Sequence, residues 1–261
     1  MTTTVPTFGE RLRDWRQKRR LSQMDLALDA EISTRHLSFL ETGRAAPSRD
    51  MVLRLAGRLE APLRERNGLL LAAGFAPMFP ERSFDDPGLA AMRTAVEAVL
   101  HAHMPFPALA IDRRWILLTS NAALAPLLEG VSPELLEGSV NVLRVSLHPK
   151  GVAPRIANLA EWRGHILSRL RRQLAESGDA ELADLIRELA GYPGGEAPPR
   201  AGEGAIAAPL RLKTATGELS FLSATMTFGA PLDVTVAELA IETFLPADPA
   251  TAAALRTMAG V

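Results

Sequence analysis

Hydrophobic residues in the first eighty positions recur at helical spacing and predict a series of short helices. Phe8, Leu12 and Trp15 (or Arg16) stand at i, i+4 and i+7, and basic residues occupy the remaining faces of this segment. Serine precedes the second, third and fourth apolar segments, where its side chain can cap a helix N-terminus. We therefore expect five helices, at about residues 8–20, 23–28, 34–41, 48–59 and 63–73.

The second and third predicted helices are joined by a turn of only three to four residues, which is typical of a DNA-binding helix-turn-helix. In the third segment Ile32, Leu37 and Leu40 are predicted to face the core, with His36 between the core and the outer face. The outer face would enter the major groove, and four of its residues are predicted to contact bases: Thr34, Arg35, Ser38 and Phe39. Three further residues are predicted to contact phosphates: Ser22, Gln23 and Arg44.

A small helical bundle with solvated arginines is the alternative interpretation. We disfavour it because the helix caps, the turn, the core spacing and the polar outer face all agree. The segment LSQMDLALDAEISTRHLSFLETGRAAPS resembles the Cro and phage-repressor type of helix-turn-helix of the Xre family, over about residues 8–73. Glu31 departs from that pattern, because the family usually has glycine at this turn position, and we expect the turn to relax around it.

The second half of the chain alternates between predicted helices and predicted strands. A Pro-rich linker at 77–87 is followed by a predicted helix at 89–101. The remaining predictions are strands at 108–111 and 115–119, a short helix capped by Asn121 and ending at 128, helices at 154–176 and 179–190, and strands at 206–213, 218–228 and 233–245. Two strands, several helices and then three antiparallel strands is the order of a PAS-like sensor domain.

The expected fold class is therefore α+β. An all-α domain of five helices with the helix-turn-helix is predicted at residues 1–78, a linker and connecting helix at 79–104, and a PAS-like domain with an antiparallel sheet flanked by helices at 105–261.

Four segments resemble the MmyB-like regulators: LSFLETGRAAPSRDMVLRLA, which precedes the second half of the chain, and then NVLRVSLHPKG, the EW pair at 161–162, and FGAPLDVTVAELAIETFLPAD. With the helix-turn-helix, this resemblance covers nearly the whole chain. It implies a transcription regulator whose PAS-like domain binds a fatty acid or another small apolar molecule.

Nine residues are candidates for the ligand pocket: Phe106, Trp115, Asn121, Arg144, His148, Trp162, His165, Phe221 and Phe228. Each aromatic member is better explained as an ordinary core residue than as a ligand contact. An acyl carboxylate needs a cation or donor at the pocket mouth, which Arg144 and His148 could supply. We nevertheless favour structural roles for Asn121, as a helix cap, and for His148, packed before Pro149.

Composition narrows the function classes. The chain is 47% hydrophobic and 23% charged, as in soluble globular proteins, and it has no cysteine, which excludes disulfides and thiolate zinc sites. No apolar run approaches the ~18 residues that span a membrane, and the N-terminus lacks the apolar core of a secretory signal, so a cytoplasmic location is expected. Residues 1–80 carry 13 basic and 9 acidic residues and the rest 16 and 21, so only the first part is expected to face phosphate.

The leading hypothesis is a sequence-specific regulator that binds a double-stranded DNA operator as a homodimer and responds to a small apolar ligand. An enzymatic second half is disfavoured because the sequence has no nucleophile, phosphate or metal motif, and His101-x-His103 lacks ligand partners at suitable spacing. We accordingly expect no metal and no catalytic cofactor. A DNA-binding module fused to a protein-interaction domain without a small ligand stays open.

Overall fold

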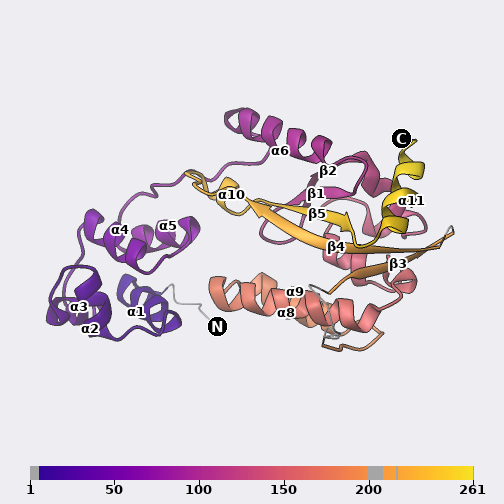
Figure 1. Ribbon diagram of the computed structural model, residues 1–261. Coiled ribbons are helices and arrows are strands. Elements are labelled where there is room, and N and C mark those ends of the chain that lie inside the picture. Colours follow the sequence, from indigo (N-terminus) through magenta and orange to yellow (C-terminus); the bar gives the residue numbers. More distant parts are fainter. Residues whose placement is uncertain (1–5, 199–207, 216, 261) are drawn as a thin grey trace. The chain divides into compact units, whose positions relative to one another are not determined.

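The computed structural model describes residues 6–198, 208–215 and 217–260, which form two compact units. The first unit runs to Arg82 and includes Ala230–Ala237, and the second comprises Ser83–Gly229 and the residues from Glu238 onward (Figure 1). The segment 230–237 thus belongs to the first unit, although it lies far away in the sequence and we had placed it in the PAS-like domain.

The first unit has the expected helix-turn-helix. Its helices are α1 (Phe8–Lys18), α2 (Gln23–Asp29), α3 (Thr34–Glu41), α4 (Arg49–Arg58), α5 (Leu63–Ala72) and the short α10 (Val234–Ala237). In each of the first four, a Thr or Ser side chain at the N-cap accepts a hydrogen bond from the backbone N–H three residues further on. Leu12, Leu26, Leu37 and Leu55 are completely buried in the shared core, which confirms the predicted inner faces.

The turn between α2 and α3 differs from our expectation, because it does not relax around Glu31. Glu31 adopts a left-handed conformation with φ of 56°. Its N–H donates to the carbonyl of Leu28 at 3.1 Å, and that of Ile32 donates to the carbonyl of Ala27 at 2.9 Å. This is the Schellman pattern that usually ends in glycine, so the turn keeps its geometry with a strained residue.

The second unit is built on an antiparallel sheet with the strand order β2-β1-β5-β4-β3. The strands are β1 (Ala108–Ile111), β2 (Leu117–Ser120), β3 (Leu210–Thr214), β4 (Gly217–Thr227) and β5 (Ala240–Pro246). The described helices are η1 (Pro87–Leu89), α6 (Ala90–Ala102), η2 (Ala122–Leu128), η3 (Pro133–Leu135), α7 (Val142–Leu147), η4 (Ala153–Arg155), α8 (Leu159–Ser177), α9 (Ala180–Ala190) and α11 (Pro249–Ala259). The predicted α+β class is confirmed.

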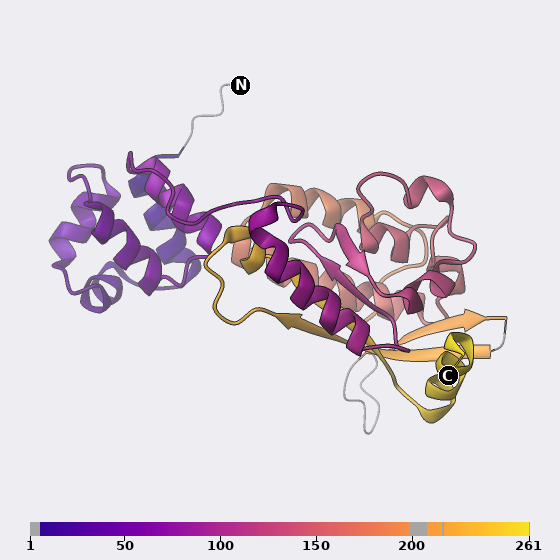
Figure 2. The ribbon, with the colours of Figure 1, turned by 90° about the horizontal axis from the view of Figure 1, so that it is seen from above.

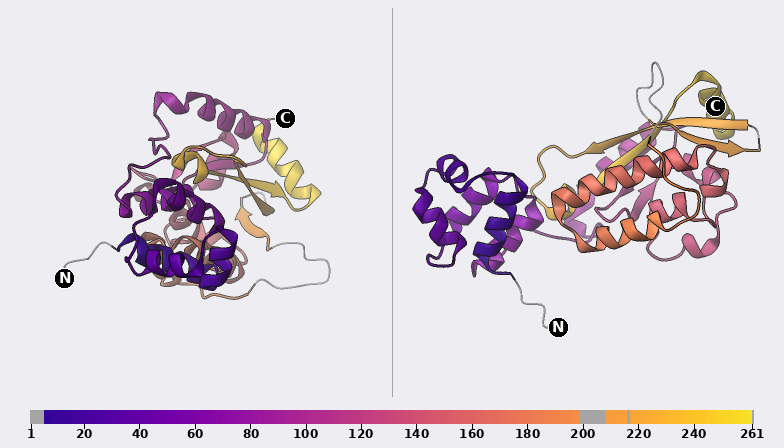
Figure 3. Two further views of the ribbon diagram at one scale, coloured as in Figure 1. Left: turned by 90° about the vertical axis from the view of Figure 1, so that its left-hand side faces the viewer. Right: turned by 90° about the horizontal axis from the view of Figure 1, so that it is seen from below.

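Helices cover both faces of this sheet (Figures 1 and 2). Leu109 and Ile111 of β1 pack in one core with the residues of α8 and α9, whereas Ala108 and Ala110 pack in another core with those of α6. Seen from below, α8 and α9 lie side by side (Figure 3). Because alternate residues enter different cores, all four residues of β1 are buried.

Several element boundaries differ from the predictions for local reasons. Strand β2 begins at Leu117, because Trp115 is left-handed with φ of 66°. The predicted strand at 233–245 divides into α10 and β5, and the predicted helix at 154–176 begins only at Leu159 because η4 precedes it. Residues 206–207 of a predicted strand lie outside the described residues. The helices α7 and α11 were not predicted.

Candidate DNA interface and ligand cavity

The four predicted base-contacting residues lie together on α3, on the side away from the buried Leu37 and Leu40. Thr34 and Arg35 are exposed, and Ser38 and Phe39 are half-buried. The Arg35 guanidinium carbon lies 5.3 Å from the centre of the Phe39 ring, within the range of a cation–π contact. The arrangement offers donors, a hydroxyl group and an apolar surface, which are the groups that distinguish bases in a major groove.

A buried ion pair anchors the C-terminal end of this helix. Arg16 of α1 donates from Nε and Nη2 to the two carboxylate oxygens of Glu41, at 2.6 and 3.0 Å, and Nη1 donates to the carbonyl of Leu21. The side chain of Glu41 is only 2% exposed, and it also accepts a hydrogen bond of 2.8 Å from Nε2 of Gln23. Glu41 therefore fixes α3 to both α1 and α2, a role that the sequence analysis did not predict.

The pKa of Glu41 reflects two opposing effects. Burial raises this pKa, but the hydrogen bonds and charge of Arg16 together with the hydrogen bond from Gln23 outweigh it, so the pKa lies below the usual value. Glu41 is therefore ionised at neutral pH, and its negative charge balances the positive charge of Arg16.

The predicted phosphate-contacting residues lie at the ends of α2 and α3. The Ser22 hydroxyl accepts from the backbone N–H of Asp25 at 3.1 Å as a helix cap. Gln23 is half-buried and bonded to Glu41, while Arg44 is exposed just beyond α3. Their phosphate contacts stay predictions. The half-buried His36 contributes its backbone N–H to the cap at Ser33.

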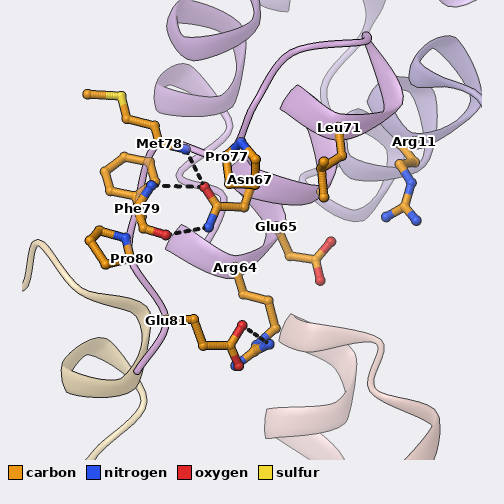
Figure 4. A pocket seen from close by; sticks show the side chains of 11 residues that line it. Arg11, Arg64, Glu65, Asn67, Leu71, Pro77, Met78, Phe79, Pro80 and Glu81 are labelled. Carbon is orange, nitrogen blue, oxygen red and sulfur yellow. Dashed lines mark hydrogen bonds and ion pairs between the residues drawn. The ribbon is translucent and has the colours of Figure 1, made fainter. Parts of the chain in front are cut away.

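A hollow beside α5 marks where the chain leaves the helix-turn-helix (Figure 4). The Asn67 side chain accepts from the backbone N–H groups of Met78 and Phe79, each at 3.0 Å, and donates to the carbonyl of Phe79 at 2.7 Å. Arg64 and Glu81 form an ion pair of 2.6 Å at the rim. The first residues after α5 are thus fastened to that helix.

The segment 230–237 is fastened to the same stretch. Nη1 of Arg82 pairs with the buried carboxylate of Asp233 at 2.8 Å, and the Thr235 hydroxyl donates to the carbonyl of Arg82 at 2.5 Å. The backbone N–H of Val234 donates to the carbonyl of Pro80 at 2.8 Å. The connection between β4 and β5 is therefore an integral part of the first unit.

The second unit contains a cavity of about 340 Å³ between the sheet and the helices on one of its faces. Its wall is mostly apolar and includes Leu124, Leu127, Val142, Ile166 and Phe244. Cavities of a few hundred Å³ with such walls are typical of sites for small molecules.

One ion pair stands in this apolar wall. Arg169 of α8 donates from Nη1 and Nη2 to the two carboxylate oxygens of Glu242 on β5, at 3.0 and 2.6 Å. The Thr225 hydroxyl donates to the same carboxylate at 2.9 Å and accepts from Nη2 of Arg169 at 2.8 Å. The guanidinium carbon lies 4.5 Å from the centre of a Trp115 ring.

The other polar groups of the wall carry no charge at neutral pH. The His165 ring is stacked on Trp162, with 5.4 Å between the ring centres. Burial and the nearby charges of Arg169 and Arg172 lower the pKa of His165. The indole N–H of Trp162 donates to the Ser146 hydroxyl at 3.1 Å.

Only three of the nine candidates for the pocket line this cavity: Trp115, Trp162 and His165. Asn121 does not cap η2 with its side chain. Its side chain instead accepts from the backbone N–H of Ala108 and donates to the carbonyls of Leu100 and Phe106, so it joins β1 to the end of α6.

The other candidates are engaged elsewhere. Arg144 is exposed and pairs with Glu188 at 2.8 Å, because α7 turns its neighbours Leu143 and Val145 inward. His148 packs edge-on against Tyr192. Phe106 packs against His103, and Phe221 packs against Phe244. Phe228 packs against the core on the opposite face of the sheet.

Sequence reasoning missed Arg169 and Glu242. Arg169 lines the cavity, whereas its neighbour Arg171 pairs with Glu196 at 2.6 Å. A basic residue three or four positions from buried apolar residues of the same helix was the only indication.

Within residues 6–198, 208–215 and 217–260, the structure has no group of three or more acidic or histidine residues suited to a metal ion. Over the same part of the chain, no helix is both long and apolar enough to cross a membrane.

The fold and these two sites define a DNA-binding helix-turn-helix protein with a separate ligand-binding unit. Comparison with protein families agrees: the MmyB-like transcription regulator ligand binding domain matches residues 92–258, and a helix-turn-helix domain matches residues 7–69. The chain therefore belongs to the MmyB-like transcription regulators and carries a helix-turn-helix domain.

Solved structures and curated proteins complete the comparison. The restriction-modification controller protein C.AhdI from Aeromonas hydrophila is 34% identical over 23% of this chain and 89% of its own, with a TM-score of 0.22. The clp gene regulator ClgR from Corynebacterium glutamicum is 22% identical over 38% of this chain and 93% of its own, with a TM-score of 0.24. An RNA-binding light-oxygen-voltage receptor is 14% identical over 97% of this chain and 63% of its own, with a TM-score of 0.24. No curated protein matches the chain in sequence.

Proposed function

We propose that this regulator binds a double-stranded DNA operator as a homodimer, and that a small apolar molecule in the cavity of its second unit controls that binding. The observation that carries the proposal is an apolar cavity of about 340 Å³ in the domain that matches a ligand-binding family. Two strands, a set of helices and three antiparallel strands support a PAS-like sensor. The resemblance to the MmyB-like regulators implies fatty acids as one class of apolar ligand to test.

The exposed face of α3 supports specific contact with bases. Arg35 can donate two hydrogen bonds to guanine, and Phe39 or the Thr34 methyl group can contact a thymine methyl. One such helix covers only a few base pairs, so pairing two copies on a two-fold operator would multiply the specificity. We infer that Ser22, Gln23 and Arg44 hold the register through phosphates.

Chain connectivity supports control of the first unit by the cavity. Ser223 on β4, together with Glu242 and Phe244 on β5, lines the cavity. The segment that joins β4 to β5 is fastened to the first unit through Asp233 and Thr235. A molecule that shifts β4 and β5 would therefore displace the segment 230–237, which belongs to the DNA-binding unit. We further infer that the second unit binds its ligand without transforming it and that the protein works in the cytoplasm, where its operator would lie.

A pair of matched arginine variants tests the DNA contacts. Arg35→Ala should weaken binding to a selected operator by roughly 1–3 kcal/mol and leave binding to random DNA almost unchanged. Arg44→Ala should weaken both and flatten the dependence of affinity on salt. Equal losses on both DNAs for Arg35→Ala would overturn its proposed contact with bases. A monomer on an operator half-site, seen by native mass spectrometry, would overturn the homodimer.

A further inference from the structure

The polar groups of the cavity indicate the chemical class of its ligand. The cavity of about 340 Å³ has room for on the order of ten groups of the size of water or methylene. Its one cation, among the described residues that line it, is Arg169, and its one anion is Glu242. Nη2 of Arg169 lies 2.6 Å from Oε1 of Glu242, so the two opposite charges neutralise each other.

A ligand anion would have to compete with Glu242 for Arg169. The Glu242 side chain is only 5% exposed, and it accepts hydrogen bonds from both terminal nitrogens of Arg169 and from Thr225. Removing Arg169 from it would leave a buried carboxylate without a counter-ion, which is strongly destabilising. A carboxylate placed beside the intact pair would meet the attraction of Arg169 and the repulsion of Glu242 together, so it would gain little net stabilisation to offset its own desolvation.

The rest of the wall offers hydrogen bonds without charge. His165 has a lowered pKa and is neutral at pH 7, so its imidazole can donate or accept. The hydroxyl groups of Ser146 and Ser223 also line the cavity. Such groups suit a hydroxyl, carbonyl or ester group on an apolar body.

We propose that the cavity selects an uncharged, largely apolar molecule of about ten carbon atoms with a neutral polar group, in preference to the anion of a fatty acid of the same length. The inference rests on the proposed function, because it assumes that this cavity is the ligand site. It narrows that function to neutral molecules such as a medium-chain alcohol, ketone or ester.

The test compares three probes of equal chain length on the full-length protein at pH 7.4: 1-decanol, decanoate and decylammonium. Affinities are measured by calorimetry, and occupancy by native mass spectrometry. We expect 1-decanol to bind at least about tenfold tighter than either ion, since neither ion finds an unpaired counter-charge in the wall. Tighter binding of decanoate or decylammonium overturns the inference, while the cavity remains the ligand site.

Charge variants add an independent readout. Glu242→Gln keeps the shape of the side chain but leaves Arg169 unbalanced, so decanoate should gain at least about tenfold in affinity while 1-decanol changes little. The double variant Arg169→Gln with Glu242→Gln removes both charges and should again prefer the alcohol. Unchanged decanoate binding in Glu242→Gln overturns the inference.

A cavity-filling variant separates the two proposals. Ser223→Phe should abolish binding of 1-decanol if the cavity is the site. If none of the probes binds the wild type, or if Ser223→Phe binds them equally well, the proposed ligand site fails, and the inference on its charge fails with it.

Discussion

Removing the carboxylate of Glu41 should loosen α3 more than any substitution of an exposed residue in the first unit. Arg16 is 9% exposed and keeps only its hydrogen bond to the carbonyl of Leu21 once Glu41 is gone. Leaving one partner of a buried ion pair without the other costs about 3–5 kcal/mol. Gln23 loses its hydrogen bond to Glu41 in the same variant, and we take the whole cost of Glu41→Ala to the first unit as about 3–5 kcal/mol.

A double-mutant cycle with Arg16→Met and Glu41→Leu separates the energy of the ion pair from the effect of each substitution alone. The double variant leaves no unpaired charge and should be far less destabilised than Arg16→Met or Glu41→Leu by itself. The exposed pair of Asp14 and Lys18 provides the control, because Asp14→Ala should cost at most about 1 kcal/mol.

Hydrogen exchange detected by mass spectrometry measures these effects in the full-length protein. Peptides that cover α3 should lose about 150- to 5000-fold in protection in Glu41→Ala, since 1.36 kcal/mol corresponds to a factor of ten. Peptides of α8 provide the internal reference. Unchanged protection of α3, or a double variant as unstable as the single ones, would refute the anchoring role of Glu41.

Three further predictions concern the same unit. Because the pKa of Glu41 is lowered in the folded state, its carboxylate stabilises the fold fully above the ordinary pKa of 4.5, and this stabilisation is lost as the pH falls through the lower folded value. The stability of Glu41→Gln should therefore depend less steeply on pH below about 4.5 than that of the wild type, measured by acid unfolding. Glu31→Gly should raise the midpoint of thermal unfolding and stabilise by about 0.5–1 kcal/mol, because glycine removes the left-handed strain but adds unfolded-state entropy; a lower midpoint contradicts this. Gly9→Ala should destabilise the first unit by about 1–3 kcal/mol in a urea titration, since the new Cβ would lie 2.5 Å from the carbonyl oxygen of Glu41. The control Gly57→Ala, whose new Cβ would meet no other atom within 4 Å, should stabilise slightly in the same titration.

The helix-turn-helix could be predicted almost completely because its determinants are local. The caps at Ser22, Ser33 and Ser48 and the apolar spacing of each helix lie within a few residues of the elements that they specify. The anchoring of α3 was missed for the opposite reason: Arg16 and Glu41 are 25 residues apart, and charged residues are expected at the surface.

The cavity was harder to predict because its polar wall is assembled over long distances. Arg169 meets Glu242 across 73 positions of sequence, and no periodicity indicates that pairing. Arg144 and His148 looked suitable because they are four residues apart, but the short α7 buries Leu143 and Leu147 and turns Arg144 to solvent. The aromatic residues Trp115 and Trp162 were found because large apolar side chains form most cavity walls.

Control of DNA binding by the cavity is tested most directly by the affinity of the full-length protein for its selected operator, measured with the cavity occupied and empty. The protein is stripped of any bound apolar molecule, and the operator Kd is compared before stripping, after stripping and after 1-decanol is added back. We expect the operator Kd to change at least about fivefold on stripping, to be restored by the added molecule, and to stay constant in Ser223→Phe. The same Kd in all three states would contradict control of DNA binding by the cavity.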